Sequence, residues 1–419
     1  MRSLISEING KLPRTTKDIS ISLDGKNLII TGMNGCGKTV FLKLLFDAIV
    51  FSVDMPKKTQ KSHLIQQIHD LESRIQTGNV VYSDETIGIF KNEISRYKQE
   101  LISLFKLNDI NPVWVDHDLV LDLYENKSFL VSFYEATRQY TNHITSTPYG
   151  QNLKSLSEIR AHGRSQLLVQ DFSTNFEAYI VAFFEAGYMA SLIRDEPEEK
   201  LKVDNWLEAV KNDLCYLFED ESLSIIYNEN ERCFYIHQAG KAPYTFATLS
   251  SGYSSILKIY TDLLMKVELY NINKNELTGI VIIDEIDAHL HISLQRKILS
   301  FLSHSYPNVQ FIVSTHSPFV IQSVDDAVIY DLSKLEQLED LSLYSYNAIV
   351  KGLLGANTNS NHLLEITDEL SSLLSDVALN KKRVLELIAQ LSPVVTELDS
   401  KSRTILLMAN QAIEDVEGL

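Results

Sequence analysis

Residues 27–39 read NLIITGMNGCGKT, and this stretch decides the fold. It begins with the apolar pattern of a short buried strand, and the apolar residues 40–53 that follow it predict a helix. The glycine-rich letters in between match the phosphate-binding loop GxxxxGK[ST], in the strand–loop–helix context that this loop requires. A glycine turn that matches this pattern by chance is a much weaker interpretation, because both the residues of the loop and its position between a strand and a helix match.

The residue types in this loop have chemical reasons. Glycines let backbone N–H groups curl around phosphate, and the N-terminus of the following helix adds positive potential. Lys38 is predicted to reach the β- and γ-phosphates of ATP, and Thr39 to bind Mg²⁺ through its hydroxyl. Cys36 is interpreted as a small loop residue rather than a redox group. The residues predicted to bind the nucleotide here are Asn34, Gly35, Cys36, Gly37, Lys38 and Thr39.

Residues 279–285 read GIVIIDE, an apolar strand that ends in two adjacent acids. Such a strand is typical of a central parallel sheet that is covered on both faces. At its carboxyl end, Asp284 is predicted to bind Mg²⁺, and Glu285 to act as the base or to position the attacking water. Two acids after a strand are weak evidence alone, but they are strong evidence downstream of the glycine-rich loop.

The composition limits the classes of function. The chain has 419 residues, of which 45% are hydrophobic, and a formal net charge of −17. Nucleic-acid phosphates repel so acidic a chain unless its basic residues cluster, which argues against broad coating of DNA. No run of about 18 apolar residues predicts a membrane span, and residues 1–13 lack the pattern of a signal peptide. The cysteines form no metal-ligand spacing and no disulfide framework, which suits a cytoplasmic location.

Residues 249–253 read LSSGY and lie upstream of the acidic strand. By itself this run indicates only the start of a helix, with serine as the N-cap. However, the order of glycine-rich loop, Leu-Ser-x-Gly, Asp-Glu strand and a later histidine resembles that of the ABC ATPases. The resemblance implies a head-to-tail dimer, in which Ser250 and the amides of Ser251 and Gly252 donate to the γ-phosphate of ATP held by a second subunit.

Two histidine-containing segments follow the acidic strand. Residues 313–318 read VSTHSP, and the resemblance implies that His316 contacts the γ-phosphate and helps to place the water, although a lone histidine there would more often be a core residue. Residues 286–291 read IDAHLH and correspond to the loop that touches the partner subunit in ABC ATPases. A zinc site at these two histidines is a poor interpretation, because no third histidine or cysteine is close in sequence.

The pattern is less specific near Arg138, which follows the strand-like stretch FLVSFY at residues 129–134. In related ATPases the equivalent strand leads to a Q-loop or to an arginine near the nucleotide. Two interpretations of Arg138 stay open, a phosphate contact and a plain surface arginine. Gln139 is the better-placed Q-loop candidate, because Gln66 and Gln67 fall in an inserted segment.

The predicted fold class is α/β, an ABC-ATPase head in which helices flank a mixed P-loop NTPase sheet. Residues 1–55 and 110–335 are expected to form this ATPase domain. Residues 56–109 have apolar positions at helical spacing on both sides of a polar break, which predicts an inserted helical hairpin. Residues 336–419 predict a C-terminal helical segment, which either docks a partner or an oligomer or only caps its own domain. Pro393 is expected to end or kink one of its helices.

Within the ABC class, the chain resembles the soluble branch that includes SMC proteins, RecF and OLD ATPases. A finer similarity, carried by LSSGYSSIL, DEIDAHLH and GLLGANT (residues 352–358), links it to anti-phage ATPases, namely PtuA of Septu and retron systems and AriA of the PARIS system. This resemblance implies an oligomer with an effector encoded beside it, an HNH or TOPRIM nuclease. A phage protein or DNA is the implied trigger, and no membrane partner is expected.

Three functions therefore compete. The first is an ATPase subunit of a defence complex that senses infection and controls a nuclease or toxin effector. The second is a RecF- or SMC-like ATPase of DNA repair or recombination, which shares every ATPase motif. The third is an architectural switch that binds ATP with negligible hydrolysis. The Glu285 carboxylate favours real, if slow, hydrolysis over this third function.

Overall fold

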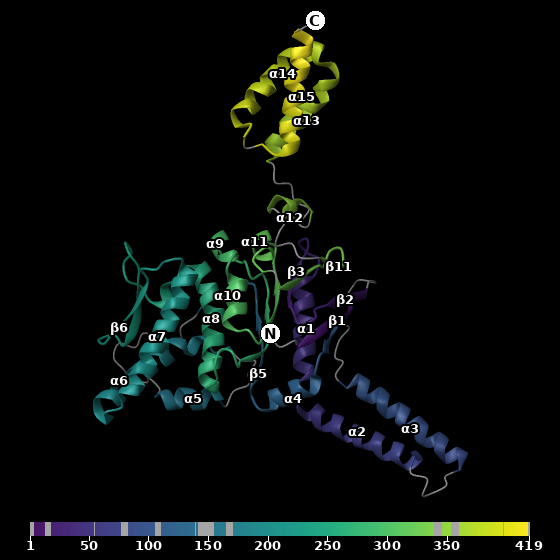
Figure 1. Ribbon diagram of the computed structural model, residues 1–419, viewed down its shortest axis with the longest axis vertical. Helices are drawn as coiled ribbons and strands as arrows, with labels where there is room; N and C mark the ends of the chain where they lie inside the picture. Colours follow the sequence, from purple (N-terminus) through teal and green to yellow (C-terminus); the bar gives the residue numbers. More distant parts are fainter. Residues whose placement is uncertain are drawn as a thin grey trace. The chain divides into compact units, whose positions relative to one another are not determined.

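The protein divides into two compact units, Met1–Tyr344 and Ser345–Leu419, which are described separately below. The computed structural model (Figure 1) describes residues 4–12, 18–53, 55–76, 83–104, 110–138, 140, 155–164, 171–324, 326–338, 346–352, 360–396 and 398–417.

A largely parallel sheet forms the centre of the first unit, in the strand order β11-β10-β3-β9-β8-β5. The strands are β3 (Asn27–Thr31), β5 (Phe129–Tyr134), β8 (Thr278–Ile283), β9 (Val309–Ser314), β10 (Ala327–Asp331) and β11 (Glu336–Leu338). Every residue of β3, β8 and β9 is buried, which explains their near-continuous apolar sequences. Only β11 runs antiparallel to its neighbour, so the carboxyl ends of the other strands share one edge.

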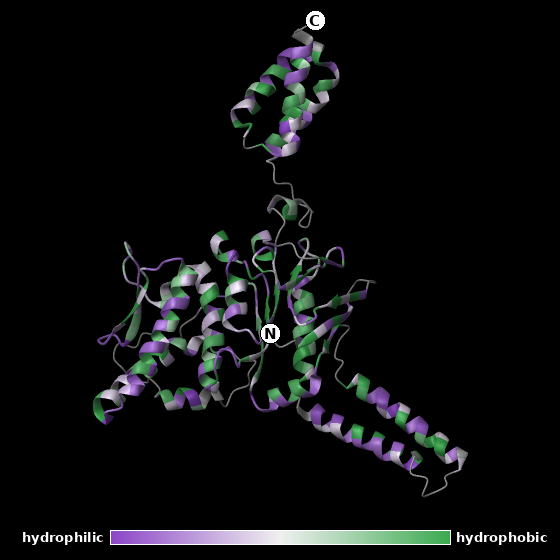
Figure 2. Ribbon diagram, viewed as in Figure 1, coloured by the Kyte–Doolittle hydropathy of each residue, from purple (hydrophilic) through white to green (hydrophobic). Residues whose placement is uncertain are grey.

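A second sheet packs its apolar side chains into the same core. It has the antiparallel order β2-β1-β4, with β1 (Ile5–Lys11), β2 (Asp18–Ser22) and β4 (Ile110–Trp114). Helix α1 (Lys38–Ser52) shares this core and is coloured mostly as hydrophobic in Figure 2. Gln310 of β9 joins the two sheets, since its side-chain amide accepts from the N–H of Ile5 at 2.9 Å and donates to the carbonyl of Ile5 at 3.2 Å.

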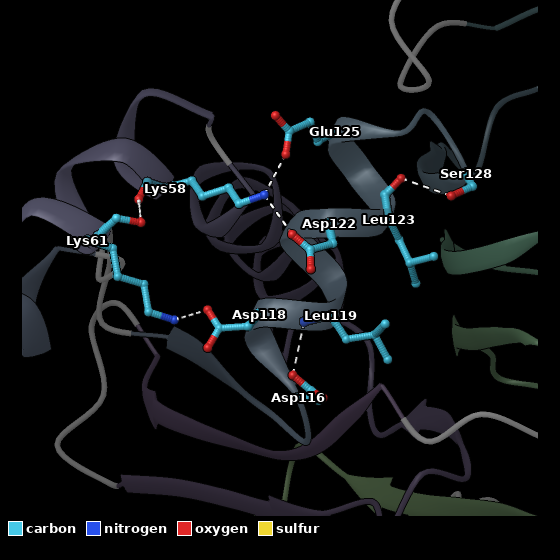
Figure 3. A network of polar contacts seen from close by, with 10 residues as sticks. Lys58, Lys61, Asp116, Asp118, Leu119, Asp122, Leu123, Glu125 and Ser128 are labelled. Carbon is cyan, nitrogen blue, oxygen red and sulfur yellow. Dashed lines mark hydrogen bonds and ion pairs between the residues drawn. The ribbon is translucent and has the colours of Figure 1, made fainter. Parts of the chain in front are cut away.

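Two long helices, α2 (Met55–Gln76) and α3 (Asp84–Ser103), lie side by side in the region where the hairpin is predicted (Figure 1). They share a small apolar cluster of Ile68, Leu71 and Ile94. Ion pairs attach α2 to helix α4 (His117–Glu125), as Figure 3 shows. Lys58 contacts Asp122 at 2.6 Å and Glu125 at 2.5 Å, and Lys61 contacts Asp118. These partly exposed pairs orient the base of the hairpin and add little stability.

A helical region lies between β5 and β8 in the sequence. It contains α5 (Leu156–Arg164), α6 (Phe176–Arg194), α7 (Pro197–Phe218), the hairpin β6 (Ser224–Asn228) and β7 (Cys233–His237), and α8 (Ser251–Tyr270). Of the described residues, only Ser173–Arg194 form a helix that is long and apolar enough to cross a membrane, by length and composition alone. Buried core helices pass the same test, so this is weak evidence for a membrane.

Three short helices complete the first unit: α9 (Ile292–Gln295), α10 (Ile298–Ser305) and α11 (Pro318–Ile321). Helix α9 follows the loop after Glu285, and α11 begins directly after the segment that holds His316.

The second unit is helical in its described part. Its helices are α12 (Tyr346–Gly352), α13 (Asn361–Leu373), α14 (Val377–Leu391) and α15 (Ser400–Glu417). The last three share a core that includes Leu370, Val384 and Ala409. Pro393 stands in a single 3₁₀ turn, Ser392–Val394, that follows α14, which is the effect expected of proline at a helix end. Of the GLLGANT stretch, residues 353–358 lie outside the described residues.

Candidate nucleotide site

The predicted phosphate loop joins β3 to α1 and has the backbone that its glycines allow. Gly35 and Gly37 have φ angles of 79° and 98°, in the left-handed region that favours glycine. A Cβ atom at either position would meet nothing within 4 Å. Backbone conformation rather than crowding therefore requires glycine at these two positions, and the space beside each of them is open.

Lys38 and Thr39 begin helix α1 and direct their side chains differently. The Lys38 ammonium donates to the carbonyl oxygens of Gly32 at 3.0 Å and Met33 at 3.3 Å, so it lies across the loop, and the residue is 7% exposed. The Thr39 hydroxyl donates to the Asp284 carboxylate at 2.7 Å. The two residues predicted to bind Mg²⁺ are thus brought together although they are far apart in the sequence.

Asp284 lies at the end of β8 and is almost fully buried. Its other carboxylate oxygen accepts from the Ser314 hydroxyl at 2.5 Å. A carboxylate beside a threonine hydroxyl is the oxygen donor set that Mg²⁺ takes next to nucleotide phosphates, so the residues present fit this ion.

Glu285 follows at once and is half-buried, with a left-handed φ of 46°. Its N–H donates to the Ser314 hydroxyl at 2.8 Å, and the N–H of Ile286 donates to the Ser314 carbonyl at 3.0 Å. The Glu285 carbonyl accepts from the N–H of Ala288 at 2.8 Å. These contacts fix a tight turn at the carboxyl end of the sheet, where the acid is predicted to act.

His316 lies two residues beyond the end of β9 and is half-buried. Burial lowers the pKa of its imidazole, and the positive charge of Lys38 lowers the pKa further, while Asp287 and Glu285 act in the opposite direction. The imidazole is therefore neutral at neutral pH, when it offers both a donor and an acceptor. The charge of Lys38 reaches this ring, as expected if both residues face one nucleotide.

The predicted signature residues lie at the start of α8. Ser250 is the N-cap residue, and Ser250 and Ser251 are exposed. Gly252 is needed for packing, because a Cβ atom there would lie 2.6 Å from the carbonyl oxygen of His289. The start of α8 is thus exposed, and the anion contact that the resemblance to ABC ATPases implies for these residues stays a prediction.

Arg138 is neither a surface arginine nor free to bind phosphate in this structure. The residue is 4% exposed. Its terminal nitrogens donate to the carbonyl oxygens of Glu135, Asp284, Glu285 and Ile286, at 3.0, 2.8, 3.1 and 3.0 Å. This geometry does not support the predicted phosphate contact. Gln139, the Q-loop candidate, lies outside the described residues.

Sequence reasoning missed two serines of the site. Ser314 connects Asp284 to Glu285, as described above. Ser333 follows β10 and accepts from the N–H of Met33 at 2.6 Å. Ser333 also explains why residue 32 is a glycine. The φ angle of Gly32 is 134°, and a Cβ atom added there would lie 2.6 Å from the Ser333 hydroxyl oxygen. Serine is too common for either position to have been found without the strand register.

The loop after Glu285 has no metal-like geometry. His291 caps helix α9, since its ring nitrogen accepts from the N–H of Ser293 at 3.4 Å, while His289 is exposed. The described part of the chain contains no group of three or more His, Cys, Asp and Glu side chains that could hold a metal ion.

The fold and the site together define the class of protein. The first unit has an α/β P-loop ATPase fold. The phosphate loop joins a strand to a helix, and the strand that ends in Asp284 and Glu285 lies two places away in the parallel sheet. The strand between them leads to His316. Residues 28–322 match the family model described as "AAA domain, putative AbiEii toxin, Type IV TA system", and the chain belongs to this family.

Named relatives agree with this class. The chain is 44% identical to the Retron Ec83 probable ATPase of Escherichia coli over 85 residues, 20% of this chain and 16% of the relative. It is 29% identical to the Septu protein PtuA of Bacillus thuringiensis over 153 residues, 34% of this chain and 38% of the relative. These relatives confirm the resemblance to retron and Septu ATPases, whereas the PARIS resemblance stays a prediction. The chain spans well under half the length of either relative.

Solved structures with some likeness include an Smc head bound to the C-winged helix domain of ScpA, with a TM-score of 0.32 and 14% identity, covering 80% of this chain and 96% of that one. A nucleotide-free ATP-binding cassette from an ABC transporter gives a TM-score of 0.30 and 12% identity, covering 79% and 87%.

Proposed function

We propose that this chain binds and hydrolyses ATP as a subunit of a bacterial anti-phage defence complex. The observation that carries the ATPase part is the 2.7 Å contact between the Thr39 hydroxyl and the Asp284 carboxylate, at the edge where β3 and β8 end. Two residues with Mg²⁺-binding chemistry meet there beside the glycine-rich loop.

The mechanism follows from the groups at this edge. The loop amides and the Lys38 ammonium would bind the phosphates, and Thr39 and Asp284 would hold Mg²⁺, whose charge would offset that of the phosphates. Glu285 accepts the proton of the attacking water. His316, kept neutral by burial and by the charge of Lys38, orients that water or the γ-phosphate through a hydrogen bond.

The proposal includes a head-to-tail dimer. The exposed serines at the start of α8 support it, because they would donate to the γ-phosphate of ATP bound by a second subunit. Two nucleotides would then lie between two copies of the first unit, with higher oligomers as a further possibility of assembly.

The defence role is supported by the retron and Septu relatives. Under this proposal the partner is a nuclease or toxin effector, of the HNH or TOPRIM type that the resemblance implies, and a phage protein or DNA is the trigger. The second unit is the proposed docking element, because its helices form a core of their own.

The experiment compares ATP turnover and phage plating for the wild type and matched variants. Lys38→Ala is expected to abolish ATP binding. Glu285→Gln is expected to bind ATP, to turn it over only at a low residual rate and to accumulate a dimer in size-exclusion chromatography. Lys98→Ala and Glu336→Gln, both at exposed positions outside the site, are the controls. Absence of ATP turnover in the wild type refutes the ATPase assignment, and wild-type turnover in Glu285→Gln refutes the role proposed for Glu285. Unchanged phage plating after deletion of the gene, with its neighbours present, refutes the defence role. ATP-dependent DNA binding without any effect of phage supports the RecF-like alternative.

A further inference from the structure

The segment between β5 and Tyr140 is built around a single buried guanidinium. Arg138 bridges four carbonyl oxygens, one on its own segment and three in consecutive residues, Asp284, Glu285 and Ile286. Arginine is the one side chain whose planar fork can donate to several acceptors in fixed directions at once. A multidentate donor thus lies on the backbone of the turn that carries Glu285.

Burying this group is unfavourable unless it has a specific task. Burial lowers the pKa of Arg138 to about 10, against the opposing effects of the acids at Asp287, Asp284 and Glu285. The guanidinium still carries its charge at neutral pH, and its Nε atom has no hydrogen-bond partner. A packing role alone would be served better by an apolar side chain of similar volume.

The turn that Arg138 holds has an unusual backbone. Glu285 has a φ of 46°, a region that residues with a Cβ atom rarely adopt and that needs support from surrounding contacts. Ser314 supplies one support, through the N–H of Glu285 at 2.8 Å. Arg138 supplies the other, because its contacts fix the peptide planes before and after Glu285. Together they set the direction of the Glu285 side chain.

The far end of the segment is also anchored. The N–H of Tyr140 donates to the Ser254 hydroxyl at 2.8 Å, and Ser254 is a buried residue in the first turns of α8. At the near end, the N–H of Asp284 donates to the carbonyl of Tyr134 at 2.8 Å. Arg138 thus stands between a strand that is fixed to β8 and a helix that begins with the signature residues.

We propose that Arg138 is a positioning residue that directs the Glu285 carboxylate at the attacking water by holding the backbone of its turn, and that Ser254 keeps Arg138 in place. The inference rests on the proposed ATPase function. It differs from a phosphate contact, because Arg138 acts on catalysis through Glu285 and leaves ATP affinity unchanged.

The test measures kcat, KM and the dissociation constant of ATP for Arg138→Lys and Arg138→Gln. Both variants are expected to lower kcat about 100-fold, the effect of a small misplacement of a catalytic group, with ATP affinity unchanged. Lysine does not rescue, since one ammonium cannot reach four carbonyls. In a Glu285→Gln background the same changes are expected to have no further effect on kcat. An equal loss in that background, or a loss of ATP affinity that accounts for the loss of rate, overturns the proposal.

Chemical rescue gives a second readout. A cavity of about 140 Å³ is lined by Arg138, Tyr134 and Lys258 among others, so Arg138→Ala leaves space for a guanidinium ion at a low, non-denaturing concentration. Guanidinium is expected to restore part of kcat in this variant and to leave Arg138→Ala/Glu285→Gln unchanged. Ammonium is the matched control, and rescue by both ions to the same degree contradicts a role for the planar fork.

The outcomes separate the two proposals. If the wild type turns over no ATP, the proposed function fails. If the wild type turns over ATP but the Arg138 variants keep the wild-type kcat, or Glu285→Gln does so, only this inference fails. If the Arg138 variants do not fold, Ser254→Ala serves instead, and it is expected to lower kcat without changing ATP affinity. A wild-type kcat in Ser254→Ala then overturns the inference.

Discussion

Helix α8 carries a buried ion pair whose removal has a calculable effect. Lys266 and Asp262 are one turn apart, 2.7 Å from each other, with side chains 0% and 1% exposed. Asp262 also accepts from the N–H of Phe172 at 2.7 Å and from the hydroxyl of Tyr134, and Lys266 donates to the Ser132 hydroxyl at 2.7 Å. Lys266→Met keeps the volume of the stem but leaves the carboxylate without its counter-charge. The expected loss in free energy of unfolding is about 3–5 kcal/mol.

A matched control is provided by Lys200 and Asp204 of α7, which have the same i,i+4 spacing and a contact of 2.6 Å, but are 43% and 37% exposed. Lys200→Met is expected to leave the free energy of unfolding nearly unchanged, because water already solvates both of these charges. The assay is urea unfolding followed by tryptophan fluorescence. Both tryptophans of the chain, Trp114 and Trp206, belong to the unit that contains the ion pair, so the signal reports on that unit.

The result that refutes this reasoning is a similar loss for the two lysine variants. A further variant, Lys266→Met/Asp262→Leu, removes both charges and is expected to recover much of the stability lost in Lys266→Met, because no uncompensated charge remains in the core. A double variant less stable than Lys266→Met would mean that the hydrogen bonds of Asp262, rather than its charge, dominate.

Three other changes test separate parts of the structure. Burial raises the pKa of Glu177 to about 7, and a hydrogen bond from Tyr140 opposes this shift more weakly. The folded state therefore holds this proton more tightly than the unfolded chain does. As a result, the free energy of unfolding falls as the pH rises from 4.5 to about 7. The fall is about 3 kcal/mol, and Glu177→Gln is expected to remove it in urea unfolding at several pH values; an unchanged pH dependence contradicts the assignment. Gly32→Ala places a Cβ atom 2.6 Å from the Ser333 hydroxyl at a φ of 134°, and it is expected to weaken ATP binding about 10-fold or more in a fluorescent-nucleotide titration; wild-type affinity would show that the loop tolerates the side chain. Ser314→Ala removes the contacts to Asp284 and to the N–H of Glu285, so kcat is expected to fall about 10- to 100-fold. A wild-type kcat in this variant would show that the turn at Glu285 does not need Ser314.

The α/β fold class was predictable because its strongest signals are local. NLIIT and GIVII are unbroken apolar runs, and the structure buries every residue of β3 and β8. Each run is followed by residues that a parallel sheet places at its carboxyl edge. Proximity of Thr39 to Asp284 follows from strand order alone, which explains why sequence reasoning reached this pair. Their roles in catalysis stay predictions.

Arg138, Ser314 and Ser333 were not assigned their positions from the sequence, because their contacts depend on register between distant segments. Ser333 meets Met33 across 300 residues of chain. Arg138 was considered as a phosphate contact because the equivalent strand of related ATPases leads to an arginine near the nucleotide. In this structure, its guanidinium donates to neutral carbonyl oxygens instead. Lys266 follows Asp262 at a spacing typical of exposed helical pairs, and nothing in the local sequence indicates that both are buried.

The close packing of Gly252 against His289 has a consequence for the proposed dimer. The start of α8 would face the nucleotide bound by the partner subunit. The loop that contains His289, in contrast, follows Glu285, which is the proposed base for the nucleotide of its own subunit. A Cβ atom added at Gly252 would lie only 2.6 Å from that carbonyl oxygen, so the two backbones are in close contact. In the proposed dimer, a movement at one nucleotide would therefore shift the groups at the other. In such a dimer, hydrolysis at the two sites would be coupled, and the dependence of turnover on ATP concentration would depart from a simple hyperbola.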